Sequence, residues 1–521
     1  MPSAYQFSPD DAPRFPGSPY TPPHAPQRRL AYALTALLLG ICATLGNGLV
    51  SVNTGVLAGG LGLYSAEAAW LNAVYVAFNA CANLVLIRAR SRFGIPEVTR
   101  VLLLAYAACA VIQVARPAFA GALLVRAASG LTAAGLTTLT IYYLVQALPP
   151  AKRPAALALG IVLPQFGPPL ARLLPVEWLA LAGWRGLSCI ELALPLAALA
   201  ALSALPLPPS LRNAAFARRD FLTIALLLPG MLMLCGALAQ GRLLWWTDSP
   251  WLGAMLAGGV LLTGCALVHE SRRRYPLLQL HWLTGPLMLR FAAVAVLVRL
   301  ALAEQTFGAV GLLALSGLNN DQFHTLFGCV LGAMALGALT ALLTMRLQRL
   351  PWQVLAAALV IAAGAWLDSR AGVLTGPEQL YLSQSLLGFG TALFMGPTLV
   401  YGFSKMAERG ADHLVSFVVL FSVTQNVGGL AGAALLGSLQ TVAARYHVQQ
   451  LAERLPIGDI GAQLALRTDG AGLLREASVR AFNDVFLLVA GLALLTAAFI
   501  ALQQARRAWR QRFSSSPEYP A

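Results

Sequence analysis

The sequence predicts an all-α integral membrane protein. Of its 521 residues, 58% are hydrophobic and 11% are charged, and the apolar residues form successive blocks separated by short Arg-bearing loops. A bilayer core of ~30 Å takes about 20 apolar residues per helix, and only helices and closed barrels satisfy the backbone hydrogen bonds there. Segments with strictly alternating polarity, which barrels require, are absent. The sequence therefore predicts a helical bundle.

We expect fourteen transmembrane helices, because the sequence contains fourteen such apolar blocks. The first six blocks cover residues 30–50, 68–87, 98–115, 119–147, 155–174 and 187–205. The other eight cover residues 221–240, 250–268, 286–315, 321–345, 354–367, 381–401, 417–441 and 482–503.

The basic residues support this count, because Lys and Arg concentrate in loops on the cytoplasmic side of a membrane. One side of the expected topology collects Arg28/Arg29, Arg88/Arg90/Arg92, Lys152/Arg153, Arg218/Arg219, Arg272/Arg273/Arg274, Arg346/Arg349, Lys405/Arg409 and Arg506/Arg507/Arg510/Arg512. The other side holds isolated residues such as Arg116, Arg185, Arg242 and Arg370. We therefore expect both termini in the cytoplasm, and the net charge of +15 indicates topology and not nucleic-acid binding.

The blocks divide the chain into five regions. Residues 1–29 form a Pro-rich, disordered cytoplasmic tail, and residues 504–521 form a basic one. Residues 30–205 and 286–503 form two six-helix bundles, and residues 206–285 form an inserted two-helix hairpin with its linkers. A short basic loop follows the second span of each bundle, as expected of a repeat.

One long loop, residues 442–480, lies on the side opposite the basic loops. Its apolar residues recur at helical spacing, which is typical of an amphipathic helix. This helix would either lie as a cap over the outer mouth or serve as a docking surface for a periplasmic partner.

Several motifs resemble those of the major facilitator superfamily, specifically its fourteen-span drug:proton antiporters of the EmrB/QacA type. They are Arg126-Ala-Ala-Ser-Gly130 in the fourth span, Gly160 with Gly167-Pro168 in the fifth, Trp184-Arg185 before the sixth, and Asn426-Val-Gly428-Gly429-Leu-Ala-Gly432 in the thirteenth. The resemblance covers residues 30–503. It implies the major facilitator fold, proton-driven multidrug efflux from the bacterial inner membrane, and work with a periplasmic adaptor protein and an outer-membrane channel.

Two of these motifs have a physical meaning of their own. A charge inside a lipid-embedded helix is costly unless it faces a cavity or a partner, so Arg126 is either a functional residue or a brace tied to helix-end carbonyls. Gly130 completes the same motif in the fourth span. Gly167 and Pro168 either bend the fifth span as part of the transport mechanism or form an ordinary proline kink.

Polar residues recur on one face of each of the first two spans. Asn47 and Ser51 belong to the face of the first span, together with Thr44 and Thr54, and Asn72, Asn79 and Asn83 belong to that of the second. In lipid these side chains need partners, so they either join helices or line a water-filled path. Their occurrence in adjacent spans favours the path.

The sequence also departs from the family. The loop after the second span retains Arg92 and Gly94 of the family motif, but Ser91 replaces its acidic residue and Ile87 its first Gly. The first span lacks the acid that takes up a proton in many relatives. Proton coupling would therefore need another carboxylate.

Three carboxylates are candidates for proton coupling. Glu304 in the ninth span is the first choice, because it shares a helical face with Gly308 and Gly311 and so faces protein or a cavity. Glu191 in the sixth span and Asp484 in the fourteenth are second choices. The alternative role of Glu304 is to pair with a distant Arg.

Other functions remain as alternatives. The missing acid and the altered loop are compatible with an uncoupled or importing metabolite transporter, and a membrane sensor or scaffold is a third possibility. We expect no enzyme activity, metal or cofactor, because no nucleophile–base pair, metal-ligand spacing or phosphate-binding loop is present. The expected partners are the lipid bilayer, protons and a small-molecule substrate that the sequence does not identify.

Overall fold

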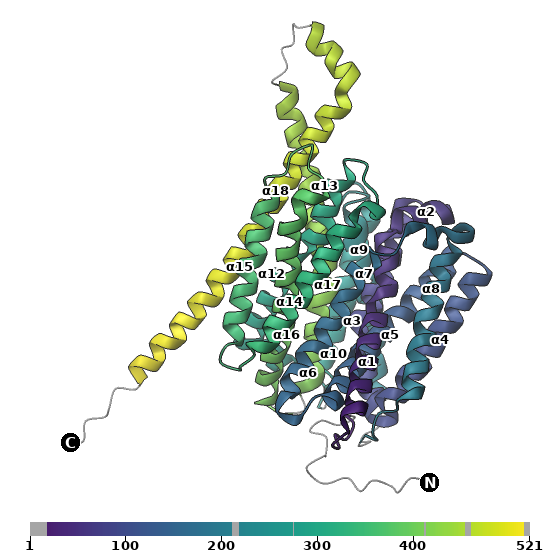
Figure 1. The fold of residues 1–521 in the computed structure, drawn as a ribbon, viewed down its shortest axis with the longest axis vertical. Coiled ribbons are helices and arrows are strands. Elements are labelled where there is room, and N and C mark those ends of the chain that lie inside the picture. The colour runs from purple at the N-terminus through teal and green to yellow at the C-terminus, as the bar shows by residue number, and fades with distance from the viewer. Residues whose placement is uncertain (1–17, 211–217, 275, 411–412, 454–459, 515–521) are drawn as a thin grey trace.

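The computed structural model describes residues 18–210, 218–274, 276–410, 413–453 and 460–514, and nearly all of these are helical (Figure 1). They contain fourteen helical segments that are long and apolar enough to cross a membrane. This confirms the fourteen spans predicted from the apolar blocks.

The first half of the bundle contains six of these segments, two of which are followed or interrupted by short helices. Its elements are α1 (Pro26–Val52), α2 (Thr54–Leu61), α3 (Ser65–Phe93), α4 (Ile95–Ala115), α5 (Phe119–Ala147), η2 (Pro150–Lys152), α6 (Arg153–Val162), η3 (Leu163–Phe166), α7 (Gly167–Ala171) and α8 (Val176–Ala204).

The remaining elements form the inserted hairpin and the second half. The hairpin and its linker contain α9 (Arg218–Gly241), α10 (Pro250–Ser271) and α11 (Leu280–Leu283). The second half contains α12 (Pro286–Ala303), η4 (Glu304–Ala309), α13 (Val310–Ala314), η5 (Asn320–Phe323), α14 (His324–Leu343), α15 (Leu350–Asp368), η6 (Pro377–Leu380), α16 (Tyr381–Ala407), α17 (Leu414–Glu453) and α18 (Ile460–Ser514).

Each half packs around its own central helices. In the first half α5 packs against α1, α3 and α4, and in the second half α16 packs against α14 and α15. The hairpin helix α9 lies along α3 and also contacts α17, so it joins the two halves. Figure 1 shows the purple-to-blue first half beside the green second half, with the start of α1 and the end of α18 at one end. We call that end, where Arg153 and Arg349 lie, the basic end. We call the opposite end, from which α17 and α18 project as a pair, the hairpin end; this name does not refer to the inserted hairpin of α9 and α10.

The basic run that follows the second span is helical, although the sequence predicted a loop. α3 continues through Arg88, Arg90 and Arg92 and ends at Phe93. Basic side chains in a last helical turn interact favourably with the helix dipole. Gly94 follows as the C-cap of the helix, and its φ of 92° is a conformation that glycine adopts readily. The run is therefore part of the second span.

The long loop expected over residues 442–480 is also helical over its described residues. α17 continues to Glu453 and α18 begins at Ile460, and the two helices contact each other. Figure 1 shows this pair projecting from the hairpin end along the long axis of the molecule. It does not lie across the end of the bundle, as the cap interpretation required, because each helix continues a span and has the other as its partner.

Candidate functional site

A cavity of about 920 Å³ lies between the two halves. α1, α3, α5 and α6 line it from the first half, and α16 and α17 line it from the second. It begins at the basic end, near Arg153 and Leu414, and reaches the level of Asn79 and Asn426. Its volume suits a drug-sized molecule.

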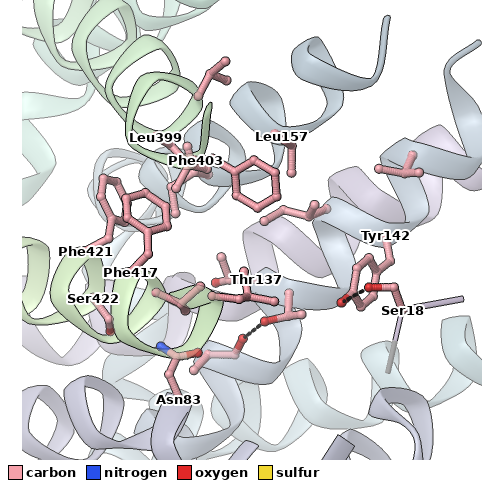
Figure 2. Close-up of a pocket in the computed structure, with 18 of the residues that line it drawn as sticks. Ser18, Asn83, Thr137, Tyr142, Leu157, Leu399, Phe403, Phe417, Phe421 and Ser422 are labelled. Atoms are coloured by element: carbon pink, nitrogen blue, oxygen red, sulfur yellow. Dashed lines mark hydrogen bonds between the residues drawn. The ribbon is translucent and has the colours of Figure 1, made fainter. Parts of the chain in front are cut away.

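The two walls of the cavity differ in chemistry (Figure 2). The second half contributes the aromatic rings of Phe403, Phe417 and Phe421, which contact one another at centroid distances of 6.5 and 6.2 Å. The first half contributes most of the polar side chains that line the cavity, among them Asn83 and Tyr142. The cavity is therefore amphipathic.

Contacts between the halves close the cavity toward the hairpin end. Asn426 of α17 donates to the Asn79 side chain of α3 at 3.5 Å. Further out, Arg172 of the first half donates to the Asn320 side chain of the second at 3.3 Å, and Trp246 of the inserted hairpin donates to Ser438 of α17 at 2.8 Å. Among the described residues, these contacts lie beyond the hairpin-end limit of the cavity, whereas its lining continues to the basic end.

A segment before α1 crosses the mouth of the cavity. Ser18 hydrogen-bonds Tyr142 at 3.1 Å, His24 hydrogen-bonds Gln146 at 2.8 Å, and Arg153 donates to Thr21 at 2.8 Å. Burial, with a smaller effect of Arg28 and Arg29, lowers the pKa of His24. The sequence predicted a disordered tail over residues 1–29; residues 1–17 lie outside the described ranges, whereas residues 18–25 are attached to the bundle.

Arg126, singled out as a mid-helix charge, is 1% exposed and forms an ion pair with Glu191 of α8. It also donates to the Gly46 carbonyl of α1 at 3.4 Å. It therefore braces α5 against α1 and α8 and does not line the cavity. Gly130 permits close contact with α3, because an added Cβ would lie 2.6 Å from the Tyr75 carbonyl oxygen.

Gly167 and Pro168 lie where the fifth span is interrupted by η3. Pro168 has no N–H to donate to the Pro164 carbonyl, and the Thr44 hydroxyl of α1 donates to that carbonyl instead. A Cβ added to Gly167 would clash with the Thr44 hydroxyl oxygen and would lie 2.8 Å from the Leu45 backbone nitrogen. The motif thus forms a tight seam between α1 and the interrupted helix, and Thr44 and Pro164 of this seam line the cavity.

The polar faces of the first two spans line the cavity only in part. Asn79 and Asn83 line it, whereas Asn47, Ser51 and Asn72 do not. Their place in a transport path therefore stays a prediction, because this conformation does not bring them to the cavity. They lie nearer the hairpin end, beyond the level at which α3 and α17 meet.

Glu304 is fully buried, and Gln384 of α16 joins it to a second acid, Asp368 at the end of α15. The Gln384 amide nitrogen lies 3.2 Å from Glu304 Oε1 and donates to Asp368 at 2.7 Å. Asp368 is inconspicuous in the sequence, because it ends its span and resembles an ordinary polar boundary residue. The alternative role of Glu304 as the partner of an Arg has no support, since no ion pair of Glu304 occurs within the described residues.

The remaining candidates lie away from the cavity. Asp484 is 52% exposed at its side chain and pairs with His447 at 2.7 Å, on the helices that project from the hairpin end. Arg92 is exposed and lies over the Phe93 ring, and Gly94 caps α3. The side chain of Trp184 lies outside the described part of the structure. No group of three or more His, Cys, Asp or Glu side chains that could hold a metal occurs in the described ranges.

The inserted hairpin supplies acids beside the altered basic run. Asp220 at the start of α9 lies 3.5 Å from Arg88 and 2.5 Å from Arg273, and Arg273 also pairs with Glu270 at 2.7 Å. Asp220 and Glu270 are both fully buried. The basic run has Ser91 where the family motif has an acid. The acid that pairs with Arg88 of this run is instead Asp220 of the inserted hairpin.

We compared the sequence and the structure of the chain with those of known proteins. No protein-family model matches the chain, and no curated protein matches it in sequence. Among solved structures, the human organic anion transporter MFSD10 (TETRAN) has a TM-score of 0.53 at 15% identity, over 90% of this chain and 100% of that one.

Two bacterial structures give similar values. A homologue of the human drug peptide transporters PepT1 and PepT2 has a TM-score of 0.55 at 12% identity, over 92% of this chain and 99% of that one. An inward-facing, unoccupied homologue of the human lysosomal transporter Spinster has a TM-score of 0.51 at 14% identity, over 92% and 97%. The chain has the major facilitator fold. The likeness supports this fold and does not distinguish the fourteen-span antiporter family within it.

Proposed function

We propose that this protein is a secondary active transporter of the bacterial inner membrane that exports amphipathic or aromatic small molecules by alternating access. The observation that carries this proposal is the amphipathic cavity between the two halves, which is open at one end and closed at the other. The positive-inside rule puts the basic end in the cytoplasm. The cavity then faces the cytoplasm, as a loading site for export requires.

Proton coupling would use Glu304 and Asp368. The side-chain amide of Gln384 joins these two carboxyl groups, and within the described residues no cation is bonded to either. A negative charge on both at once is therefore unfavourable, so the pair provides a site for a proton. Glu191 is less suited to this role, because Arg126 holds it in an ion pair.

The test is export by the purified protein in proteoliposomes under an imposed pH gradient, with a panel of aromatic acids, neutral aromatics and cationic dyes. We expect the gradient to drive accumulation, and Glu304→Gln and Asp368→Asn each to abolish that drive while leaving downhill exchange. Glu408→Gln is the matched control, because that side chain is 60% exposed. Gradient-driven export that survives both substitutions would contradict this proton site.

An uncoupled or importing metabolite transporter is the second candidate. It is favoured by the position of Glu304, which does not line the cavity, and by the absence of an acid from the first span. Exchange that is fully insensitive to the pH gradient in the same assay would support it.

The projecting part of α17 and α18 is proposed to dock a periplasmic adaptor, with an outer-membrane channel completing a tripartite pump. Two long helices that extend past the bundle provide such a surface. Replacing residues 446–478 by a short linker should abolish co-purification with the adaptor and retain exchange in proteoliposomes. Unchanged co-purification would exclude this surface.

A further inference from the structure

The charged side chains that line the cavity all carry the same sign. Of the lining residues in the described ranges, Arg90 and Arg153 are charged, and none is Asp, Glu or Lys. Both arginines belong to the first half and lie at the mouth of the cavity, at the basic end.

Neither arginine has an acidic partner within the described residues. Arg90 is 6% exposed, and its guanidinium group donates to the Tyr142 hydroxyl at 3.1 Å. Arg153 donates to the hydroxyl of Thr21 at 2.8 Å. The Nε atoms of both are buried without a hydrogen-bond partner. Two other arginines of this end, Arg88 and Arg273, are instead paired with Asp220. The positive-inside rule explains basic residues in general but not two unpaired guanidinium groups in a cavity.

The rest of the cavity suits an aromatic body with polar groups. Phe403, Phe417 and Phe421 form the apolar wall. At the closed end, Gln425 is 8% exposed, and its side-chain oxygen and nitrogen are both buried without a partner. Leaving a buried amide without hydrogen bonds costs free energy, so a bound molecule that supplies those hydrogen bonds would be stabilised here.

We propose that the cavity selects organic anions, meaning molecules with an aromatic body and a carboxylate or sulfonate group, over neutral or cationic analogues. This inference rests on the proposed transport function and names its substrate class. A guanidinium group binds a carboxylate through two parallel hydrogen bonds, so Arg90 and Arg153 would hold the anionic group while the phenylalanine rings hold the aromatic body. A cation would meet two like charges with no acid to balance them.

The test uses three ligands with one aromatic body: 2-naphthoate, 2-naphthamide and (2-naphthylmethyl)trimethylammonium. Binding to the full-length purified protein is measured by calorimetry, and exchange is measured by counterflow in proteoliposomes without a membrane potential. We expect the naphthoate to bind at least about tenfold more tightly than the other two, and Arg90→Gln and Arg153→Gln each to weaken it about tenfold, as for a lost charged hydrogen bond. Both substitutions should leave naphthamide binding unchanged.

Two controls separate charge from folding. Arg349→Gln removes an exposed arginine of the same end that does not line the cavity, and it should leave all three affinities unchanged. Arg90→Lys keeps the charge without the two-pronged geometry and should recover part of the naphthoate affinity. Unchanged elution and melting of each variant establish that it is folded.

The outcomes distinguish this inference from the transport proposal. Equal affinity for the three ligands with counterflow, or unchanged naphthoate binding in both Arg→Gln variants, would overturn the anion preference and leave transport standing. Selective naphthoate binding without counterflow of any ligand would support the anion site and contradict transport. Absence of naphthoate binding to the wild type would overturn the anion site.

Discussion

Arg126 and Glu191 show how single residues stabilise the first half. Their side chains are 2% and 7% exposed, so neither charge is solvated and each depends on the other. Removing one partner of such a pair leaves an uncompensated buried charge, whereas replacing both by apolar residues is often neutral.

We therefore expect Arg126→Leu and Glu191→Leu each to destabilise the protein by about 3–5 kcal/mol. The double variant should recover most of that loss. Thermal unfolding of the three variants in detergent measures this, and a double variant as unstable as the sum of the singles would refute the ion-pair account.

His24 makes the segment at the cavity mouth sensitive to pH. Its pKa is lowered in the attached state by burial and by Arg28 and Arg29, against the effect of Gln146, so attachment favours the neutral ring. Attachment is therefore complete above the usual histidine pKa of about 6.5 and weakens as the pH falls below it.

Hydrogen exchange of the Tyr20 amide, which donates to the Pro209 carbonyl at 3.0 Å, measures this attachment. After correction for the intrinsic rate, we expect protection at pH 7.5 and its partial loss at pH 5.5. His24→Gln should make protection independent of pH; a pH dependence that persists in this variant would assign it to another group.

At the scale of elements, close helix contacts depend on residues without side chains. The seam between α1 and the interrupted fifth span brings Gly167 against Thr44 and Leu45, and it also satisfies the carbonyl that Pro168 leaves unpaired. A methyl group at this seam has no room.

Gly167→Ala should therefore separate the two helices and reduce the amount of folded protein, because overpacking of this kind costs about 1–3 kcal/mol. Gly264→Ala is the matched control, since nothing lies within 4 Å of its added Cβ. Fluorescence size-exclusion chromatography compares them. Equal yields would show that the seam adapts.

The inserted hairpin is held by buried charge as well as by apolar packing. Glu270 accepts hydrogen bonds from Arg273 at 2.7 Å and from the Leu277 amide at 2.6 Å, and so fixes the linker that leaves α10.

Glu270→Ala should lower the melting temperature clearly, because a buried acceptor that serves a charge and a backbone amide is lost. Glu408→Ala removes an exposed pair with Lys405 and should have little effect. Similar melting curves for the two variants would contradict the role assigned to Glu270.

At the scale of the whole molecule, closure at the hairpin end depends on a few contacts between the halves. Arg172 donates to Asn320 and lies 5.0 Å from the Phe327 ring centre, and the Val176 amide donates to Asp321 at 3.1 Å. These contacts stabilise the arrangement in which the hairpin end is closed. Their loss should therefore shift the population toward the arrangement in which the hairpin end is open.

We expect Arg172→Ala to increase the population of molecules whose two halves are separated at the hairpin end. Spin labels at Glu177 and Leu374, introduced as unnatural amino acids, would report this as a longer distance in pulsed EPR. Arg370→Ala is the control, because Arg370 contacts Trp366 within its own half. An unchanged distance distribution would show that other contacts maintain closure.

The sequence predicted the features that depend on local pattern. The fourteen spans follow from apolar length, and the collection of basic residues at one end follows from their places between the spans. It also selected Glu304 and Arg126, because a charge within an apolar span is conspicuous without knowledge of its surroundings. The extent of α3 and α17 was underestimated, because polar helices outside the membrane lack the apolar signal.

Tertiary structure decided which residues meet. The pairing of Arg126 with Glu191, the junction of Glu304 with Asp368 through Gln384, and the level at which the cavity closes each depend on the relative depth and rotation of separate helices. Hydropathy sets how far a helix spans the bilayer, but in lipid it does not distinguish one apolar face from another. Packing between small residues and buried polar groups makes that choice, so the spans were readable from the sequence and the cavity was not.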